Sequence, residues 1–477
     1  QEAYASGGKC GDPAESVHER IETGRRLMAY RCRIAYSGVY IRKRDLYMNK
    51  KELELYVHIP FCVRKCAYCD FLSFPSGEHE RASYVDALLE EIKEQKDNFK
   101  DYFVTTVFLG GGTPSLLRED DTARIFDALW ENFDISRSAE ITLEVNPGTV
   151  TGKKAAVWKA CGMNRLSIGL QSVNDGELKM LGRIHTFKEF LDTWRIVREK
   201  GFDNINIDLI SAIPGQTVQS WEKTLRTIAE LGAEHISAYS LIIEEGTSFY
   251  RLYGEVHNSD GETPASCAEK NGGASGIPPL PGEDAEREIY KSTGRILKEY
   301  GYHRYEISNY AKEGYECRHN LGYWERKEYL GLGLGASSLI SEHRFHNTEN
   351  MERYLQIFGK HSVLAGSGSR ATSPRTFPAG GNGTNPQMLP TGAAAEDVEA
   401  LSVSEQMEES IFLGLRKTEG ISCREFREKF GQTLDEVYGE QIRRFEKLGL
   451  MEREKDRLRL TERGIDVSNS IFVEFML

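Results

Sequence analysis

Three cysteines that stand close together near the start of the chain are the residues best suited to chemistry. Cys62, Cys66 and Cys69 lie in HIPFCVRKCAYCDF, with the spacing C-x3-C-x2-C, directly after a predicted strand. Three thiolates on one loop can hold three irons of a [4Fe–4S] cluster. The fourth iron then lacks a protein ligand and is open to bind and react, as in catalytic metal sites that keep one position free. A zinc site, with His58 or Asp70 as the fourth ligand, is the alternative.

A glycine-rich segment follows the second predicted strand. Gly110, Gly111 and Gly112 precede Thr113 and Pro114 in VFLGGGTPS. Glycine permits positive φ angles and lets a ligand approach the main chain closely. The place of this segment at the end of a strand favours a ligand-binding loop, and a simple tight turn is the alternative.

Polar side chains also stand in apolar strands or at their ends. Glu144 lies in ITLEVNPG, Gln171 ends LSIGLQS, and Asp208 lies within INIDLI. Such groups are costly to bury unless they are paired, so they indicate either a ligand site or a structural polar network. Arg183, in LGRIHT, can bind a carboxylate through two parallel hydrogen bonds.

These features together resemble the radical S-adenosylmethionine superfamily: the C-x3-C-x2-C motif after the first strand, Tyr68 before the third cysteine, and GGGTP after the second strand. The resemblance implies that the amino and carboxylate groups of S-adenosylmethionine chelate the open iron. An electron from the reduced cluster then cleaves the sulfonium to a 5′-deoxyadenosyl radical. It also implies that GGGTP receives the methionine amino group and that Arg183 meets the carboxylate. The cofactor contacts implied in this way are Tyr56, Tyr68, Gly111, Gly112, Thr113, Glu144, Gln171, Arg183 and Asp208.

Further stretches resemble one family within this superfamily, which contains the oxygen-independent coproporphyrinogen III oxidase and the HemW-type heme chaperone. They include EVNPG, NINIDLISAIPGQT, RYEISNYA and LGLGLGASS, and the resemblance runs from about Glu52 to the C-terminus apart from two insertions. The oxidase carries a further cysteine where this chain has Phe71, and residues 1–47 do not resemble its N-terminal arm. HNLGYW at 319–324 matches the chaperone's HNxxYW. The resemblance therefore favours a protein that binds heme and delivers it. Coproporphyrinogen III dehydrogenase, which forms protoporphyrinogen IX by oxidative decarboxylation, and a radical enzyme on another substrate are the alternatives.

The HNLGYW stretch supplies the candidate heme contacts. His319 is a candidate axial ligand, and Cys317 is a second one. Tyr323 and Trp324 are suited to stack on a porphyrin. The alternative is that His319 and its neighbours make structural hydrogen bonds and pack on the barrel. The family resemblance implies heme or porphyrin, heme-acceptor proteins and an electron donor as partners, and it leaves peripheral membrane association and the oligomeric state open.

The elements that must position these residues alternate along the chain. Short β-branched runs are followed by amphipathic stretches long enough for crossover helices, which predicts parallel strands. Six such units indicate an α/β fold, a partial (β/α) TIM-type barrel, with a doubly wound open sheet as the alternative. The expected strands are 53–59, 105–109, 141–145, 165–170, 204–210 and 236–242, and the expected helices are 79–98, 119–132, 151–161, 186–200, 217–231 and 284–300.

The chain outside these units divides into several parts. Residues 1–47 lack a sustained period and are expected to be a disordered extension outside the core. The barrel core spans 48–358, with a Pro- and Gly-rich disordered insertion near 256–282. A second disordered insertion spans 359–400. Residues 401–477 form a small helical, winged-helix-like domain, with helices at 403–416, 422–430 and 434–448 and a hairpin at 451–464.

Composition excludes other classes of protein. The net charge of −12 over 477 residues is a poor match to a phosphate backbone, so nucleic acid is not expected as a partner. The sequence has neither an apolar run of about 18 residues nor a secretory signal at its start. Nine cysteines, mostly scattered, do not form a disulfide framework, and they favour a reducing compartment. A cytoplasmic location is therefore expected.

Overall fold

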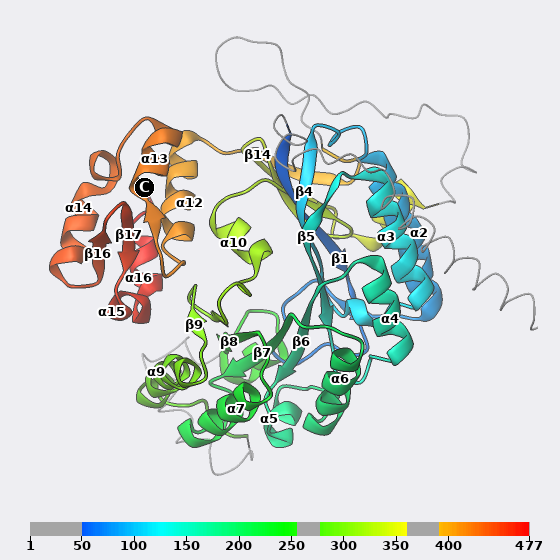
Figure 1. Ribbon diagram of the computed structural model, residues 1–477, viewed down its shortest axis with the longest axis horizontal. Helices are drawn as coiled ribbons and strands as arrows, with labels where there is room; N and C mark the ends of the chain where they lie inside the picture. The colour runs from blue at the N-terminus through cyan, green and yellow to red at the C-terminus, as the bar shows by residue number, and fades with distance from the viewer. Residues whose placement is uncertain (1–49, 255–276, 360–390, 477) are drawn as a thin grey trace, which may run out of the picture. The chain divides into compact units, whose positions relative to one another are not determined.

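A twelve-stranded sheet forms the main body of the protein (Figure 1). The computed structural model describes residues 50–254, 277–359 and 391–476. The elements discussed below all belong to one compact unit, Lys51–Leu477. Seven neighbouring strands of the sheet run parallel, in the order β11, β1, β4, β5, β6, β7, β8. Their bounds are β1 Lys51–Ile59, β4 Tyr102–Gly111, β5 Ile135–Val145, β6 Arg165–Gln171, β7 Ile205–Ser211, β8 His235–Ser240 and β11 Tyr329–Leu332.

Helices cover the outer face of the parallel strands, as crossover connections require. Figure 1 shows α2, α3, α4 and α6 on this face. A capping box marks the start of α6, where Thr186 Oγ1 accepts from the Glu189 N–H while the Glu189 carboxylate accepts from the Thr186 N–H. The six predicted parallel strands and their helices are confirmed, and β11 adds a seventh strand beside β1. The helices are α2 Glu78–Glu94, α3 Glu119–Asn132, α4 Gly152–Cys161, α6 Phe187–Glu199, α7 Val218–Glu230 and α9 Glu283–Glu299.

Short antiparallel strands extend the sheet on both sides, and its two outer strands, β14 and β9, do not pair with each other, so the barrel is partial as expected. Residues 395–400 were assigned to the second insertion, yet they form the edge strand β14 on β13. Likewise, Pro279 in the first assigned insertion accepts a hydrogen bond from the Gly215 N–H. The expectations for residues 1–47, 256–276 and 360–390 lie outside the described residues. The added strands are β9 His303–Arg304, β10 Asn309–Ala311, β12 Ser337–Ile340, β13 His343–Asn347 and β14 Ala395–Ala400.

The C-terminal residues build a second hydrophobic core, which includes Ile411, Phe426, Tyr438, Ile442 and Phe475. The three predicted helices and the predicted hairpin are confirmed, and two short helices follow the hairpin. These elements are α12 Val403–Gly414, α13 Cys423–Phe430, α14 Leu434–Lys447, β16 Met451–Glu454, β17 Arg457–Leu460, α15 Glu462–Asp466 and α16 Ser468–Val473. Among the described residues, no helix combines the length and the apolar character that crossing a bilayer requires.

One short helix, α10 (Arg318–Trp324), lies on the inner side of the sheet (Figure 1). It contacts β4 on one side and α12 on the other. Its Gly322 packs directly against the side chain of Glu54 on β1, and a Cβ at this position would overlap the Glu54 carboxyl group. Close approach of α10 to the sheet therefore requires glycine here.

We expect Gly322→Ala to lower the free energy of unfolding by about 1–3 kcal/mol, the usual cost of forcing extra atoms into a packed core. Urea unfolding followed by circular dichroism measures the change. Gly294→Ala in α9 is the matched control, because its Cβ would lie at an ordinary contact distance, 3.8 Å from the Tyr310 hydroxyl. Equal stabilities of the two variants would contradict the packing argument.

Candidate functional site

The cysteine loop begins where β1 ends, at the C-terminal edge of the parallel sheet. Cys62 lies in β2 (Phe61–Cys62), which pairs with β3 (Phe74–Pro75) and so closes the loop at its base. Within the loop, the Cys69 N–H donates to the Cys66 carbonyl, at 3.4 Å. All three cysteines are free and partly exposed, so they are open to an incoming ligand.

The donor set of this loop fits an iron–sulfur cluster. Burial raises the pKa of the Cys69 thiol, and the neighbouring Cys66 and Cys62 raise it further. A bound metal would stabilise the thiolates against this effect. In the part of the chain that the structure describes, no three Cys, His, Asp or Glu side chains converge on one preformed metal position.

Arg183 follows the short helix α5 (Asp175–Met180) and reaches back to the cysteine loop. Its Nη1 donates to the Cys66 sulfur at 3.7 Å, and its Nη2 donates to Asn146 Oδ1 at 2.6 Å and to the Gly169 carbonyl at 2.7 Å. Its Nε is buried and has no hydrogen-bond partner among the described residues. A buried guanidinium N–H without a partner beside the cysteine loop has the chemistry to donate to a ligand carboxylate.

The GGGTP segment lies beside the same loop. Gly111 has φ +109°, in the region that favours glycine, and a Cβ there would overlap the His58 ring. Thr113 Oγ1 accepts from Asn146 Nδ2 at 2.7 Å and lies 3.5 Å from the Cys62 sulfur. Asn146 thus joins the glycine-rich segment to Arg183. Asn146 was not among the residues predicted from the sequence, although it lies within the EVNPG stretch.

Two carboxyl groups lie on strands of the same sheet, Glu144 on β5 and Asp208 on β7, with β6 between them. Glu144 Oε2 accepts from the Gly111 N–H at 3.0 Å, and burial together with the charge of Asp208 raises the pKa of Glu144 to about 8. Asp208 accepts from Ser167 Oγ at 2.9 Å and from Asn206 Nδ2 at 2.7 Å. Both carboxylates therefore already take part in a polar network of the protein.

The remaining expected cofactor contacts lie on neighbouring elements. Gln171 ends β6 with φ +75°, a strained conformation for a residue other than glycine. Tyr56 donates to His58 Nδ1 at 3.0 Å, because His58 Nε2 donates to the Leu72 carbonyl at 2.9 Å and leaves Nδ1 as the acceptor. Tyr68 packs, partly buried, against a small cluster with Leu181, Ile210, Ile213 and Phe249.

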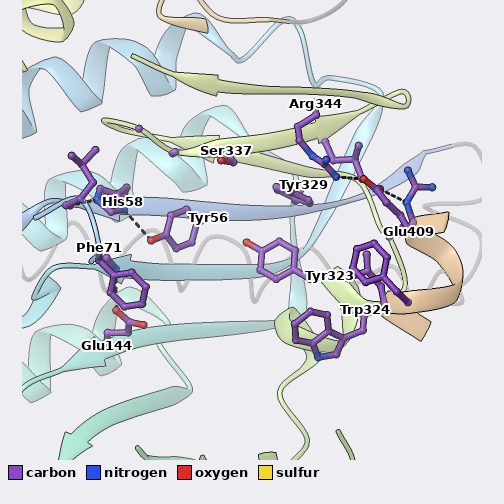
Figure 2. A pocket seen from close by; sticks show the side chains of 18 residues that line it. Tyr56, His58, Phe71, Glu144, Tyr323, Trp324, Tyr329, Ser337, Arg344 and Glu409 are labelled. Atoms are coloured by element: carbon purple, nitrogen blue, oxygen red, sulfur yellow. Dashed lines mark hydrogen bonds and ion pairs between the residues drawn. The ribbon is translucent and has the colours of Figure 1, made fainter. Parts of the chain in front are cut away.

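A cavity of about 560 Å³ lies inside the barrel, next to these strand ends (Figure 2). Tyr56, Gly111 and Glu144 form one part of its wall, and α10 and α12 form another. Its volume is in the range of ligand pockets in proteins. The aromatic residues that line it are Tyr56, Phe71, Tyr323, Trp324, Tyr329 and Phe412, and the ionisable ones besides the tyrosines are His58, Glu144, Arg326, Arg344 and Glu409.

His319 does not line this cavity but lies buried beneath it. Its Nδ1 is 2.7 Å from Thr106 Oγ1, and its Nε2 is 3.0 Å from the Tyr323 hydroxyl. Burial and the positive charge of Arg165 lower the pKa of His319 to about 3, so the ring is neutral. Cys317 is fully buried as well. Of the candidate heme residues, the structure places Tyr323 and Trp324 at the cavity and keeps both ring nitrogens of His319 engaged with the protein.

Several lining residues were not found from the sequence. Arg326 follows α10, Arg344 lies in β13, and Glu409 and Phe412 lie in α12. No motif marks them, because they come together only when α12 packs against α10.

Comparisons with known proteins identify the family of the chain. Residues 56–228 match the family model of the radical SAM superfamily, and 401–467 match the model of the HemN C-terminal domain. The heme chaperone HemW of Lactococcus lactis is 32% identical over 90% of this chain and 99% of its own length. HemW of Escherichia coli is 37% identical over 61% of this chain and 70% of its own. The solved structure of coproporphyrinogen III oxidase from Escherichia coli, 21% identical, covers 91% of this chain and 94% of that chain with a TM-score of 0.69, which shows the shared fold.

Proposed function

The chain belongs to the HemW heme-chaperone family within the radical SAM superfamily, and on this premise we propose that it binds heme and delivers it to acceptor hemoproteins. The proposal includes an electron donor for the cluster and a cytoplasmic setting. The family supports it over coproporphyrinogen III dehydrogenase, as does Phe71 in the place of the oxidase's additional cysteine.

The radical SAM domain implies a [4Fe–4S] cluster and S-adenosylmethionine. We assign the cluster to Cys62, Cys66 and Cys69, and the methionine end of S-adenosylmethionine to the GGGTP segment and Arg183. Cluster and cofactor supply one-electron chemistry when they are bound. The protein groups hold that chemistry in place: Asn146 orients both Arg183 and Thr113, and Glu144 holds the Gly111 N–H.

The observation that carries the heme proposal is the aromatic cavity. A porphyrin is a large planar π-system, and Tyr323, Trp324 and Tyr329 offer the amphipathic rings on which such a plane packs. Tyr56, Gly111 and Glu144 belong to the same wall, so heme in the cavity would adjoin the expected S-adenosylmethionine site. We keep His319 as a candidate axial ligand. Its coordination of iron would require its Nε2 contact with Tyr323 to break.

We expect the anaerobically reconstituted protein to bind heme saturably, with a Soret band distinct from that of free heme. S-adenosylmethionine should change the affinity, because the two ligands would share one wall of the cavity. Absorption titration with and without S-adenosylmethionine measures both effects. His319→Ala is titrated in parallel, and an unchanged Soret band would return that residue to a structural role.

Two outcomes would contradict the proposed function. One is the absence of saturable heme binding by a protein that carries its cluster. The other is catalytic formation of protoporphyrinogen IX from coproporphyrinogen III, followed by fluorescence after oxidation.

A further inference from the structure

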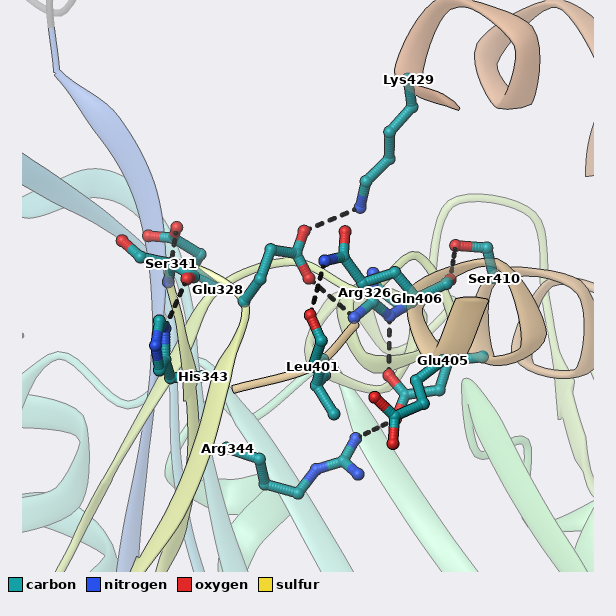
Figure 3. Close-up of polar contacts among 12 residues, drawn as sticks. Arg326, Glu328, Ser341, His343, Arg344, Leu401, Glu405, Gln406, Ser410 and Lys429 are labelled. Atoms are coloured by element: carbon teal, nitrogen blue, oxygen red, sulfur yellow. Dashed lines mark hydrogen bonds and ion pairs between the residues drawn. The ribbon is translucent and has the colours of Figure 1, made fainter. Parts of the chain in front are cut away.

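An ion-pair network joins the wall of the cavity to the C-terminal helices (Figure 3). Arg326 Nε donates to Glu409 Oε2 at 2.8 Å, and Arg326 Nη2 donates to Glu342 Oε2 at 2.8 Å. Arg344 Nη2 donates to the other oxygen, Glu409 Oε1. Both arginines belong to the barrel, and Glu409 belongs to α12. One carboxylate therefore lies between two guanidinium groups at the edge of the cavity.

The guanidinium group of Arg326 has one N–H group that lacks a hydrogen bond within the described part of the chain. The side chain of Arg326 is only 2% exposed, yet its Nη1 is buried and has no hydrogen-bond partner in the ranges that the structure describes. Although Glu409 and Glu342 balance the charge of Arg326, a buried N–H group that lacks an acceptor costs free energy. Since Arg326 lines the cavity, a ligand acceptor there would complete its hydrogen bonds.

The backbone around this network is held in an uncommon conformation. Arg326 has φ +52° and Glu342 has φ +59°, so both partners of one ion pair adopt the left-handed region without being glycine. Such strain persists where surrounding contacts impose it, and it is common at ligand sites.

Arg344 can exchange its partner more easily than Arg326. Its side chain is 43% exposed, whereas that of Arg326 is enclosed by Glu342 and Glu409. Arg326 and Arg344 together bind the planar carboxylate of Glu409, so a carboxylate is the group that suits them. A carboxylate brought by a ligand would compete with Glu409 for Arg344.

We propose that Arg326 and Arg344 form a carboxylate-binding subsite of the cavity, in which a ligand carboxylate bonds Arg326 Nη1 and displaces Glu409 from Arg344. The inference rests on the proposed function, since the two propionate groups are the carboxylates that heme offers. Ligand entry would weaken one of the contacts that hold α12 to the barrel.

Other contacts keep the C-terminal helices attached to the barrel when Glu409 is displaced from Arg344. The Thr418 N–H donates to the Tyr305 carbonyl at 3.0 Å, and Glu306 and Lys417 form a bridge of β type. Lys429 of α13 also pairs with Glu342, at 3.0 Å. The Glu409→Gln change, which keeps the shape of the side chain and removes its charge, is therefore expected to leave the fold intact.

The test compares heme with heme dimethyl ester, whose propionates are blocked, on the anaerobically reconstituted full-length protein. We expect the wild type to bind heme at least about tenfold more tightly than the ester, as one charge-assisted carboxylate contact warrants. Arg344→Gln should shrink this ratio toward one. Glu409→Gln, which removes the competing carboxylate, should widen it. Arg353→Gln is the matched control, because Arg353 pairs with Glu396 away from the cavity lining.

Equal affinities of the wild type for heme and its ester would overturn the subsite and leave heme binding in place. The subsite would also be overturned if Arg344→Gln and Arg353→Gln had the same ratio of affinity for heme to affinity for the ester. Failure of both ligands to bind would overturn the proposed function and, with it, the assignment of the subsite to heme propionates.

Discussion

Cys66→Ala should abolish the [4Fe–4S] cluster. Two thiolates cannot hold three irons, and the lost sulfur also interacts with Arg183, at 3.7 Å. Iron and sulfide in the anaerobically reconstituted protein are expected to fall from about four of each per chain to near zero, with loss of the EPR signal of the reduced cluster.

Cys423→Ala is the control for this experiment. Cys423 begins α13, in the C-terminal domain and outside the cysteine loop, so its removal should leave the iron content unchanged. Full iron and an intact EPR signal in Cys66→Ala would show that the ligand set is wrong. Stoichiometric zinc without iron in the wild type would favour the zinc alternative.

The features that are easiest to predict from the sequence are motifs contained within one short segment. The cysteine spacing lies within eight residues, and GGGTP within five, so both motifs are visible before any folding is considered. The strand ends are predictable for a related reason. Parallel strands joined by crossover helices place their C-terminal edges together, which brings Glu144 and Asp208 to the same sheet as the cysteine loop.

Contacts between distant segments were not predictable in this way. Arg326 and Glu409 are 83 positions apart and meet because α12 packs against α10, which Arg326 follows. The HNLGYW motif predicted candidate heme contacts but not the depth of His319, which depends on how closely Gly322 lets α10 approach the sheet. Strand β14 was missed because its sequence, AEDVEA, is polar and half-exposed and follows a Gly- and Pro-rich run.

The carboxyl group of Glu54, which lies beneath α10, is expected to make the stability of the protein depend strongly on pH. Glu54 is 1% exposed, and Oε2 has no hydrogen-bond partner among the described residues. Burial raises the pKa of Glu54 to about 9, although Lys327 acts in the opposite direction. At neutral pH the folded protein therefore holds a proton on Glu54 that the unfolded chain releases.

This difference makes stability fall as pH rises. Between the unfolded pKa of about 4.5 and the folded pKa of about 9, the folded state binds more protons, so the free energy of unfolding decreases by about 1.4 kcal/mol per pH unit from this group. Below about pH 4.5 both states are protonated and the penalty vanishes. Glu91 and Glu144, with pKa values raised to about 7 and about 8, act in the same direction. The contribution of Glu54 to the pH dependence of stability can therefore be measured only by comparing variants.

Glu54→Gln keeps the shape of the protonated side chain and removes its titration. We expect the variant to gain about 3 kcal/mol over the wild type between pH 4.5 and pH 7, and to gain further toward pH 9. Urea midpoints of the two proteins across this range measure the gain. Glu52→Gln is the matched control on the same strand, because Glu52 is exposed and pairs with Lys327 at the surface. A stability difference between Glu54→Gln and wild type that does not vary with pH would show that Glu54 is ionised in the folded protein, and that α10 covers a charge rather than a neutral acid.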